Sequence, residues 1–197
     1  MLRVAVVDHH PALRAGLEAI LGEQPGIAPV GSAADRCELW PLLYRTDPRV
    51  LVMGQPQRDH APGLALRVRE RRPGSRVVIY AGGTHIAVAA TFAGAYALVD
   101  RAAHERVLIE AVVAVGRGER RLPLLSAGMR RRAAALLEPA DRAILAMRLA
   151  GTPPREIADT VGITRTQLSG RSAGILAILA GRARREPIVS SAEAHVA

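Results

Sequence analysis

Short apolar runs alternate with longer amphipathic stretches along the first 115 residues. The run from Arg3 to Val7 is almost continuously apolar and stops at Asp8, which is typical of a strand buried on both faces. From Pro11 to Leu21 the apolar positions instead follow a helical stripe, with proline in the first turn. The same alternation predicts further strands near 27–30, 50–53, 76–80 and 97–99, and further helices near 35–45, 64–71, 86–93 and 104–115.

Five strands that alternate with five helices predict a doubly wound α/β domain. Its sheet is expected to be five-stranded and parallel, in flavodoxin-like order, with helices on both faces. Ligands of such sheets bind beyond the carboxyl ends of the strands, so function is sought there. Pro41 fits the predicted helix 35–45 poorly, unless that helix starts later.

No further strand is predicted after Gly116. A charged, broken segment leads into a short basic helix that contains Arg130, Arg131 and Arg132, and three helical stretches follow at 140–149, 154–161 and 165–179. Thr164 precedes the last of these and is expected to cap it. The sequence thus predicts a receiver-like domain over 1–118, a linker with a short helix over 119–137, a small all-α helix-turn-helix domain over 138–185 and a disordered tail over 186–197.

Composition narrows the class of protein. The longest uncharged run, Ile86 to Val99, is too short to cross a bilayer, and Asp8 interrupts the apolar start of the chain. The single cysteine, Cys37, excludes an internal disulfide framework and a cysteine-based zinc site. We expect a cytoplasmic protein with no cofactor and no membrane contact.

Positive charge is concentrated in the second part of the chain. All 27 basic residues are arginine, a choice typical of a GC-rich genome. Residues 1–115 hold 13 arginines and 11 acids, a net charge of +2, whereas residues 116–197 hold 14 arginines and 7 acids, a net charge of +7. The second part is therefore expected to meet a polyanion, although a solvated basic surface without a partner is the alternative.

Local motifs in both halves resemble a known family. Residues 2–119 look like a two-component receiver domain, and residues 138–179 look like a LuxR-type helix-turn-helix. The markers are Val6–Pro11 (VVDHHP), Ala93–Ala95, Ile109–Val112 followed by Gly118–Glu119, and Pro139 with Arg155–Ala158. In this order and spacing they resemble a response regulator of the NarL/FixJ type.

The resemblance also shows what the receiver pocket has lost. A receiver uses an aspartate nucleophile, two acids that hold Mg²⁺, a hydroxyl and a lysine. At these positions only Asp8 is kept: His9 replaces the second acid, Gly54 the phosphoacceptor, Ala81 the hydroxyl residue and Arg101 the lysine. Aspartyl phosphorylation and enzymatic activity are therefore not expected.

Other uses of this pocket remain open. Asp59 lies on a loop past the third strand and is not expected to replace the missing acceptor. A transition-metal site at Asp8, His9 and His10 is not expected either, because adjacent residues diverge as they leave a strand. The vacated pocket is expected either to bind a small-molecule effector, with Arg101 reaching an anion, or to serve as a fixed scaffold for folding and dimerisation.

The predicted third helix of the helix-turn-helix has an apolar and a small polar face. Leu168, Ser172, Ile175 and Leu179 share the inward face at 100° per residue. Candidate DNA contacts are Thr166, Gln167 and Ser169 for bases, with Arg155, Arg165 and Arg171 for phosphates, near Thr164, Gly170 and Ala173. Gly170 and Gly174 each weaken the helix by about 1 kcal/mol relative to alanine.

Two functions are consistent with these features. The first is a phosphorylation-independent transcriptional regulator that binds promoter double-stranded DNA. It is expected to pair as a homodimer or heterodimer through the receiver, above all through the helix 104–115. The second is an interaction partner or antagonist that reads no DNA itself and heterodimerises with a complete response regulator.

Overall fold

The computed structural model describes residues 1–57, 59–83 and 86–183. Within them a parallel sheet has the strand order β2-β1-β3-β4-β5. The strands are β1 (Leu2–Val7), β2 (Ile27–Ala33), β3 (Val50–Met53), β4 (Arg76–Ala81) and β5 (Ala97–Asp100). This confirms the predicted fold class of the first part of the chain.

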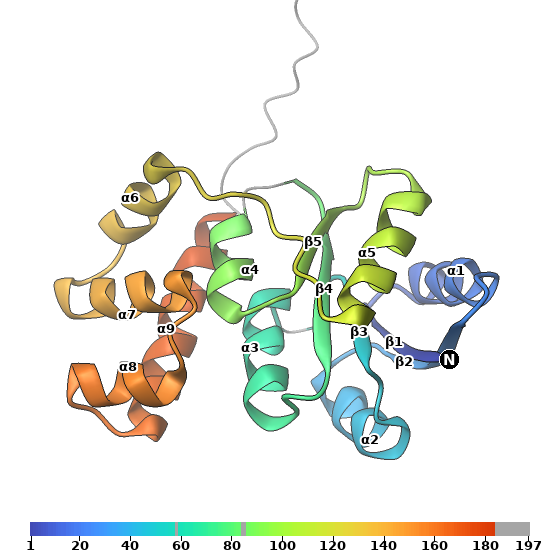
Figure 1. Cartoon of the computed structure of the whole chain (residues 1–197), viewed down its shortest axis with the longest axis horizontal. Helices are drawn as coiled ribbons and strands as arrows, with labels where there is room; N and C mark the ends of the chain where they lie inside the picture. The colour runs from blue at the N-terminus through green and yellow to red at the C-terminus, as the bar shows by residue number, and fades with distance from the viewer. Residues whose placement is uncertain (58, 84–85, 184–197) are drawn as a thin grey trace, which may run out of the picture.

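Helices cover both faces of the sheet (Figure 1). On one face lie α1 (Pro11–Gly22) and α5 (Glu105–Arg117); on the other lie α2 (Arg36–Thr46), α3 (Ala61–Arg71) and α4 (Ala87–Ala93). Successive strand side chains point to opposite faces, so Val4 and Val6 pack towards α1 and α5, whereas Ala5 and Val7 pack towards α2, α3 and α4. Apolar runs such as Val4–Val7 are therefore buried on both sides.

Caps and prolines set the helix starts, which agree with the prediction for α2 and differ from it for α3. The side chain of Asp35 accepts hydrogen bonds from the backbone of Cys37 and Glu38, so α2 begins at Arg36 and keeps Pro41 in its interior. Helix α3 begins at Ala61, three residues earlier than predicted, with Pro62 in its first turn. Proline fits there because its missing N–H would have no partner within the helix.

The rest of the described chain is helical. It forms α6 (Ala127–Ala135), α7 (Pro139–Ala150), α8 (Pro154–Val161) and α9 (Arg165–Ala183). Helix α9 continues four residues beyond its predicted end. The predicted tail, 186–197, and the end of the predicted helical domain lie outside the described residues.

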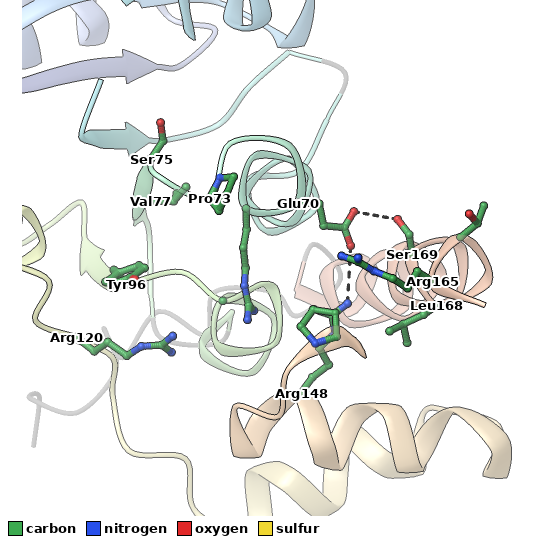
Figure 2. A pocket seen from close by; sticks show the side chains of 14 residues that line it. Glu70, Pro73, Ser75, Val77, Tyr96, Arg120, Arg148, Arg165, Leu168 and Ser169 are labelled. Carbon is green, nitrogen blue, oxygen red and sulfur yellow. Dashed lines mark hydrogen bonds and ion pairs between the residues drawn. The ribbon is translucent and has the colours of Figure 1, made fainter. Parts of the chain in front are cut away.

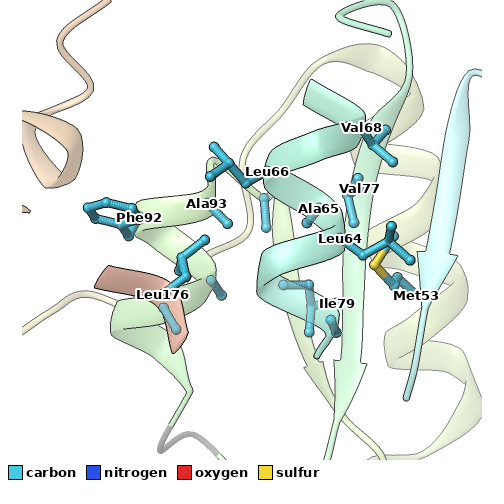
Figure 3. Packing of buried hydrophobic residues seen from close by; sticks show 14 of the residues in the cluster. Met53, Leu64, Ala65, Leu66, Val68, Val77, Ile79, Phe92, Ala93 and Leu176 are labelled. Atoms are coloured by element: carbon cyan, nitrogen blue, oxygen red, sulfur yellow. The ribbon is translucent and has the colours of Figure 1, made fainter. Parts of the chain in front are cut away.

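The helical part packs directly on the sheet part, beside α3 and α4 and away from α1 and α5 (Figure 1). Leu176 of α9 is fully buried and lies next to Phe92 and Ala93 of α4 (Figure 3). One apolar cluster runs from the sheet through α4 into the helical part. Apolar burial therefore holds the two parts in this arrangement.

The predicted linker is partly structured. Helix α5 ends at Arg117 and is followed by the capping residue Gly118. Arg121 then pairs with the outer edge of β5: its N–H donates to the carbonyl of Tyr96 at 2.7 Å, and its carbonyl accepts from the N–H of Leu98 at 3.2 Å. This pairing fixes the path of the chain between the two parts. Among the described helices, none has the length and apolar character needed to cross a membrane.

Candidate functional site

The carboxylate of Asp8 lies at the end of β1 and is completely buried. Its Oδ1 accepts the backbone N–H of His10 at 2.9 Å and lies 3.0 Å from Nδ1 of the same residue. Its Oδ2 accepts the backbone N–H of Gln55 at 2.7 Å and forms an ion pair with the guanidinium of Arg101. Burial raises the pKa of Asp8, but the hydrogen bonds from His10 and Gln55 and the charge of Arg101 outweigh it and hold this pKa below its usual range.

Gly54 leaves the space that this ion pair occupies. A Cβ at position 54 would lie well inside van der Waals distance of Oδ2 of Asp8 and 2.6 Å from Nη2 of Arg101. The backbone of Gly54 is held in place, because its N–H donates to the carbonyl of Val7 at 2.8 Å. A side chain at position 54 would therefore require Asp8 or Arg101 to shift from the positions they hold in the ion pair.

Arg101 bridges two strand ends. Its Nε donates to the carbonyl of Tyr80 at 3.2 Å while its Nη2 contacts Asp8, and Ala81 lies beside it on the wall of a small cavity of about 180 Å³. One of the two expected uses of this pocket had Arg101 reach an anion; in the structure the carboxylate of Asp8 already engages its guanidinium. The resemblance placed Asp8 and Arg101 in one pocket although they are 93 positions apart, but it did not predict that the two side chains pair with each other.

The neighbouring histidines lie closer together than predicted. Nitrogens of His9 and His10 and an oxygen of Asp8 lie within 4.8 Å of one another, and the two rings are 3.6 Å apart between centroids. The expected divergence fails because Nδ1 of His9 is bonded to the carbonyl of Gln55 at 2.8 Å, whereas His10 turns towards Asp8. A cation at this cluster would compete with Arg101 for the carboxylate.

Asp59 lies on the loop before α3. It lines a separate cavity of about 440 Å³ together with His9, Gln57 and Ala180 of α9. It is not among the residues that line the cavity at Gly54. This agrees with the expectation that Asp59 does not take the place of the acceptor.

Helices α8 and α9 form a helix-turn-helix with a well-defined turn. Helix α8 ends at Val161 and is capped by Gly162, whose φ of +71° is left-handed and favours glycine. Thr164 then caps α9 as predicted: its Oγ1 accepts the N–H of Gln167 at 3.2 Å, and Oε1 of Gln167 accepts the N–H of Thr164 at 2.8 Å. The side-chain oxygen of Gln167, predicted to contact bases, is thus engaged in the cap.

The inward face of α9 is the predicted one. Leu168, Ser172 and Ile175 are buried, and Leu179 is 9% exposed. The hydroxyl of Ser172 accepts a hydrogen bond from Nη2 of Arg148 on α7 at 3.2 Å. The position of Arg148 follows a signal that the sequence does carry: it stands four residues after Ile144 on the buried face of α7.

The outward face of α9 is partly covered. Thr166, Gly170 and Ala173 are exposed, but Oγ of Ser169 donates to Oε2 of Glu70 on α3 at 2.9 Å. Spacing along α9 did not indicate this contact, because Glu70 lies 99 positions earlier. A side chain predicted to read bases therefore faces another part of the same chain.

The three arginines predicted to bind phosphates differ in their exposure and in how closely an acid holds them. Arg171 is held by Asp141 of α7, with its Nε 2.8 Å and its Nη2 2.6 Å from Oδ1. Arg155 lies 4.0 Å from Asp159 in an exposed pair on α8, and Arg165 is exposed at the start of α9. Arg155 and Arg165 therefore present their charge to solvent, whereas Arg171 is part of the packing between α7 and α9.

Comparison with known proteins agrees with this architecture. No protein-family profile matches the chain. Over 168 residues it is 29% identical to a probable transcriptional regulatory protein, SgaR, of Hyphomicrobium methylovorum; the match spans 83% of this chain and 80% of the relative.

Solved structures show the same fold. A LuxR-family two-component response regulator from Aurantimonas matches with a TM-score of 0.57 and 27% identity over 66% of this chain and 92% of its own. RcsB of Salmonella enterica serovar Typhimurium, bound to the promoter rprA with the phosphomimetic BeF₃⁻, matches with a TM-score of 0.59 and 18% identity over 92% and 100% of the two chains. The fold is that of a response regulator, as the motifs indicated. More narrowly, it resembles the NarL/LuxR type, a receiver followed by a LuxR-type helix-turn-helix.

Proposed function

We propose that this chain is a DNA-binding transcriptional regulator whose output does not depend on aspartyl phosphorylation. The observation that supports independence from phosphorylation is the Asp8–Arg101 ion pair, which occupies the space beside Gly54. Phosphoryl transfer to a receiver needs a carboxylate nucleophile and a divalent cation that neutralises the phosphoryl oxygens. Glycine offers no nucleophile, and a guanidinium already neutralises the one remaining acid.

Support for DNA binding comes from the helix-turn-helix and its charge. The capped start of α9 presents Arg165 and Thr166 to solvent, and Arg155 adds a further exposed cation on α8. In a helix-turn-helix the start of the last helix meets base edges while flanking cations bind phosphates. Because the candidate base contacts are few and short, we expect affinity for promoter DNA to be largely electrostatic and to fall steeply with salt.

The arrangement seen here keeps part of the reading face covered. The hydrogen bond between Ser169 and Glu70 leaves no room for a base edge at Ser169. Leu176, buried against α4, adds apolar contact to the same interface. Full engagement of DNA by α9 therefore requires the helical part to move away from α3.

Fluorescence anisotropy with promoter DNA at two salt concentrations tests the DNA-binding half. Arg155→Ala is expected to weaken binding and to reduce the salt dependence by about one released counterion. Arg45→Ala is the control, because Arg45 is also exposed on a helix but lies on α2 and not on α5, the proposed dimer helix. Equal effects of the two substitutions, or no binding at low salt, would contradict the proposal.

Intact mass spectrometry tests phosphorylation independence separately. The protein is incubated with a small phosphodonor and Mg²⁺, and we expect its mass to stay unchanged. A stoichiometric phosphoryl adduct would show that the pocket still accepts a phosphoryl group and would refute this half of the proposal.

A second candidate function is supported by the covered reading face. Ser169 contacts Glu70, and Oε1 of Gln167 serves the helix cap, so fewer side chains are available to bases. A chain of this kind suits an antagonist that pairs with another response regulator through its receiver. Helix α5, where the side chain of Val107 is 47% exposed, is the surface we propose for homo- or heterodimer contact. A stable complex with a second regulator, combined with absence of DNA binding, would favour this function.

A further inference from the structure

A cleft of about 650 Å³ separates the sheet part from the helical part, and arginines from both parts line it (Figure 2). Among the described residues its charged lining consists of Arg69 and Glu70 of α3, Arg120 of the linker, Arg148 of α7 and Arg165 of α9. Four cations thus face one acid. The proposed function uses residues that line this cleft, Arg165, Thr166 and Ser169, but assigns the cleft no ligand.

Arg148 is the most deeply placed of these cations. Its side chain is 1% exposed; one nitrogen, Nη2, donates to Ser172 and lies 3.8 Å from Oε1 of Glu70. Within the described part of the chain, its Nε and Nη1 have no hydrogen-bond partner. Buried polar groups are almost always paired, whereas Arg148, which is one of the residues that line the cleft, lacks acceptors among the described residues for two of its buried guanidinium nitrogens.

Arg69 reaches the same cleft from α3. Its guanidinium packs over Gly94, where φ is +77° and where a Cβ would collide with it. Burial lowers the pKa of Arg69, and the charge of Arg120 lowers it further; burial and the charge of Arg69 likewise lower the pKa of Arg148. The cations therefore repel one another within the cleft.

The single acid does not neutralise them. Glu70 divides its carboxylate between the hydroxyl of Ser169 and the distant contact with Arg148, as the dashed lines in Figure 2 show. Arg120 is turned instead over the ring of Tyr96, 5.1 Å from its centroid. An anion with several oxygens would relieve both the repulsion and the unpaired nitrogens.

We propose that this cleft binds a phosphorylated small molecule of nucleotide size, with phosphate oxygens on Arg69, Arg120 and Arg148. Planar guanidinium groups donate in pairs to phosphate oxygens, which makes arginine well suited to this ligand. The volume of the cleft lies in the range of small-molecule sites and exceeds what a single inorganic anion needs. Tyr96 supplies an aromatic wall beside the cations.

Such a ligand would also oppose DNA binding, a consequence that rests on the proposed function. Thr166 and Ser169 of the reading helix line the cleft, so a molecule held there would contact both parts of the chain. It would favour the arrangement in which Ser169 stays bonded to Glu70. The ligand would therefore stabilise the covered form and lower the affinity for promoter DNA.

Calorimetric titration and thermal unfolding of the full chain, in magnesium-free buffer, test the ligand site without DNA. The probes are ATP and pyrophosphate, with adenosine as the control that has no phosphate. We expect ATP at about 100 times its Kd to raise the Tm by about 5 °C or more, pyrophosphate to bind more weakly, and adenosine to have no effect.

Substitutions then locate the site. Arg148→Gln and Arg69→Gln are each expected to weaken ATP binding at least tenfold. Arg120 is exposed, so Arg120→Gln tests the same site with a variant whose folding is not in question. Arg67→Gln is the matched control, because Arg67 is exposed on the same helix as Arg69 and does not line the cleft. Absence of binding by ATP and pyrophosphate, equal binding of adenosine, or an equal loss in Arg67→Gln would overturn the proposal. These results do not depend on whether the protein binds DNA.

Discussion

A methyl group at position 54 provides the sharpest test of the Asp8–Arg101 ion pair beside Gly54. Gly54 has no left-handed backbone angle, so in open space alanine would be neutral or slightly stabilising, by about 0.4–1 kcal/mol, through the unfolded state. Here its Cβ collides with Oδ2 of Asp8 and Nη2 of Arg101. Arg101 can swing aside, but Asp8 is buried and held by backbone N–H groups, so the ion pair must be disturbed.

The magnitude follows from the geometry. Overpacking a well-filled interior costs about 1–3 kcal/mol, and loss of one partner of a fully buried ion pair costs about 3–5 kcal/mol. Since 28% of the Arg101 side chain is exposed, solvent screens the second effect, and we expect Gly54→Ala to destabilise the fold by about 2 kcal/mol in total. For a chain of this length that lowers the Tm by about 4–8 °C.

Thermal unfolding followed by circular dichroism measures the effect, with Gly82→Ala as the matched control. Gly82 follows β4 as Gly54 follows β3, and a Cβ there meets nothing within 4 Å. In an Asp8→Ala background the same Gly54→Ala change is expected to cost less than half as much, because the carboxylate it strikes is gone. A Gly54→Ala protein as stable as the unaltered chain would refute the account of the pocket.

Three further outcomes follow from contacts described above. Glu70→Ala removes from the covered form the hydrogen bond between Ser169 and a charged carboxylate, which contributes about 1.5 kcal/mol. This substitution is therefore expected to raise the affinity for DNA, measured by anisotropy, up to about tenfold, whereas the control Glu110→Ala on α5 should not raise it. Thr164→Ala loses the cap of α9 and should lower stability by about 1 kcal/mol in chemical denaturation; a loss no larger than that of an exposed threonine would contradict the cap. The pKa of Asp8 is lower in the folded protein than its unfolded value of about 3.9, so the ionised carboxylate stabilises the fold above that pH, and this stabilisation is lost as the pH falls through the folded pKa. Asp8→Asn should therefore make stability depend less on pH in the acid range. An unchanged acid dependence would show that Asp8 does not cause it.

Periodicity predicted the elements well because each depends on a pattern within one segment. A continuous apolar run is buried when it forms a central strand, and a helical stripe is buried when it faces the core. The structure shows both, in the strand at Val4–Val7 and in the stripe of Leu168, Ser172 and Ile175. The cap at Thr164 is also local, since its partner, Gln167, stands three residues away. The start of α3 was predicted three residues too late, because the helix already begins at Ala61 with Pro62 in its first turn.

The chemistry of the site was harder to predict, because it depends on pairs that meet only through the fold. The resemblance to a receiver predicts from Gly54 alone that the phosphoacceptor is missing, but it does not predict that Arg101 pairs with Asp8. In the same way, sequence spacing places Ser169 on an outward face without showing that Glu70 of α3 stands opposite. An arginine has a long, flexible side chain, so its partner is decided by what the packed elements bring within reach.

The pairing of Arg121 with the edge of β5 limits how the reading helix can be released. While it persists, five peptide steps join Arg121 to Ser126, the residue that caps α6, and a fully extended chain of that length reaches ~17 Å. This short linker lets the helical part rotate about the edge of the sheet but keeps it from moving far from the sheet part. The effective concentration of α3 around α9 remains high, so dissociation from DNA should be followed by rapid reclosure.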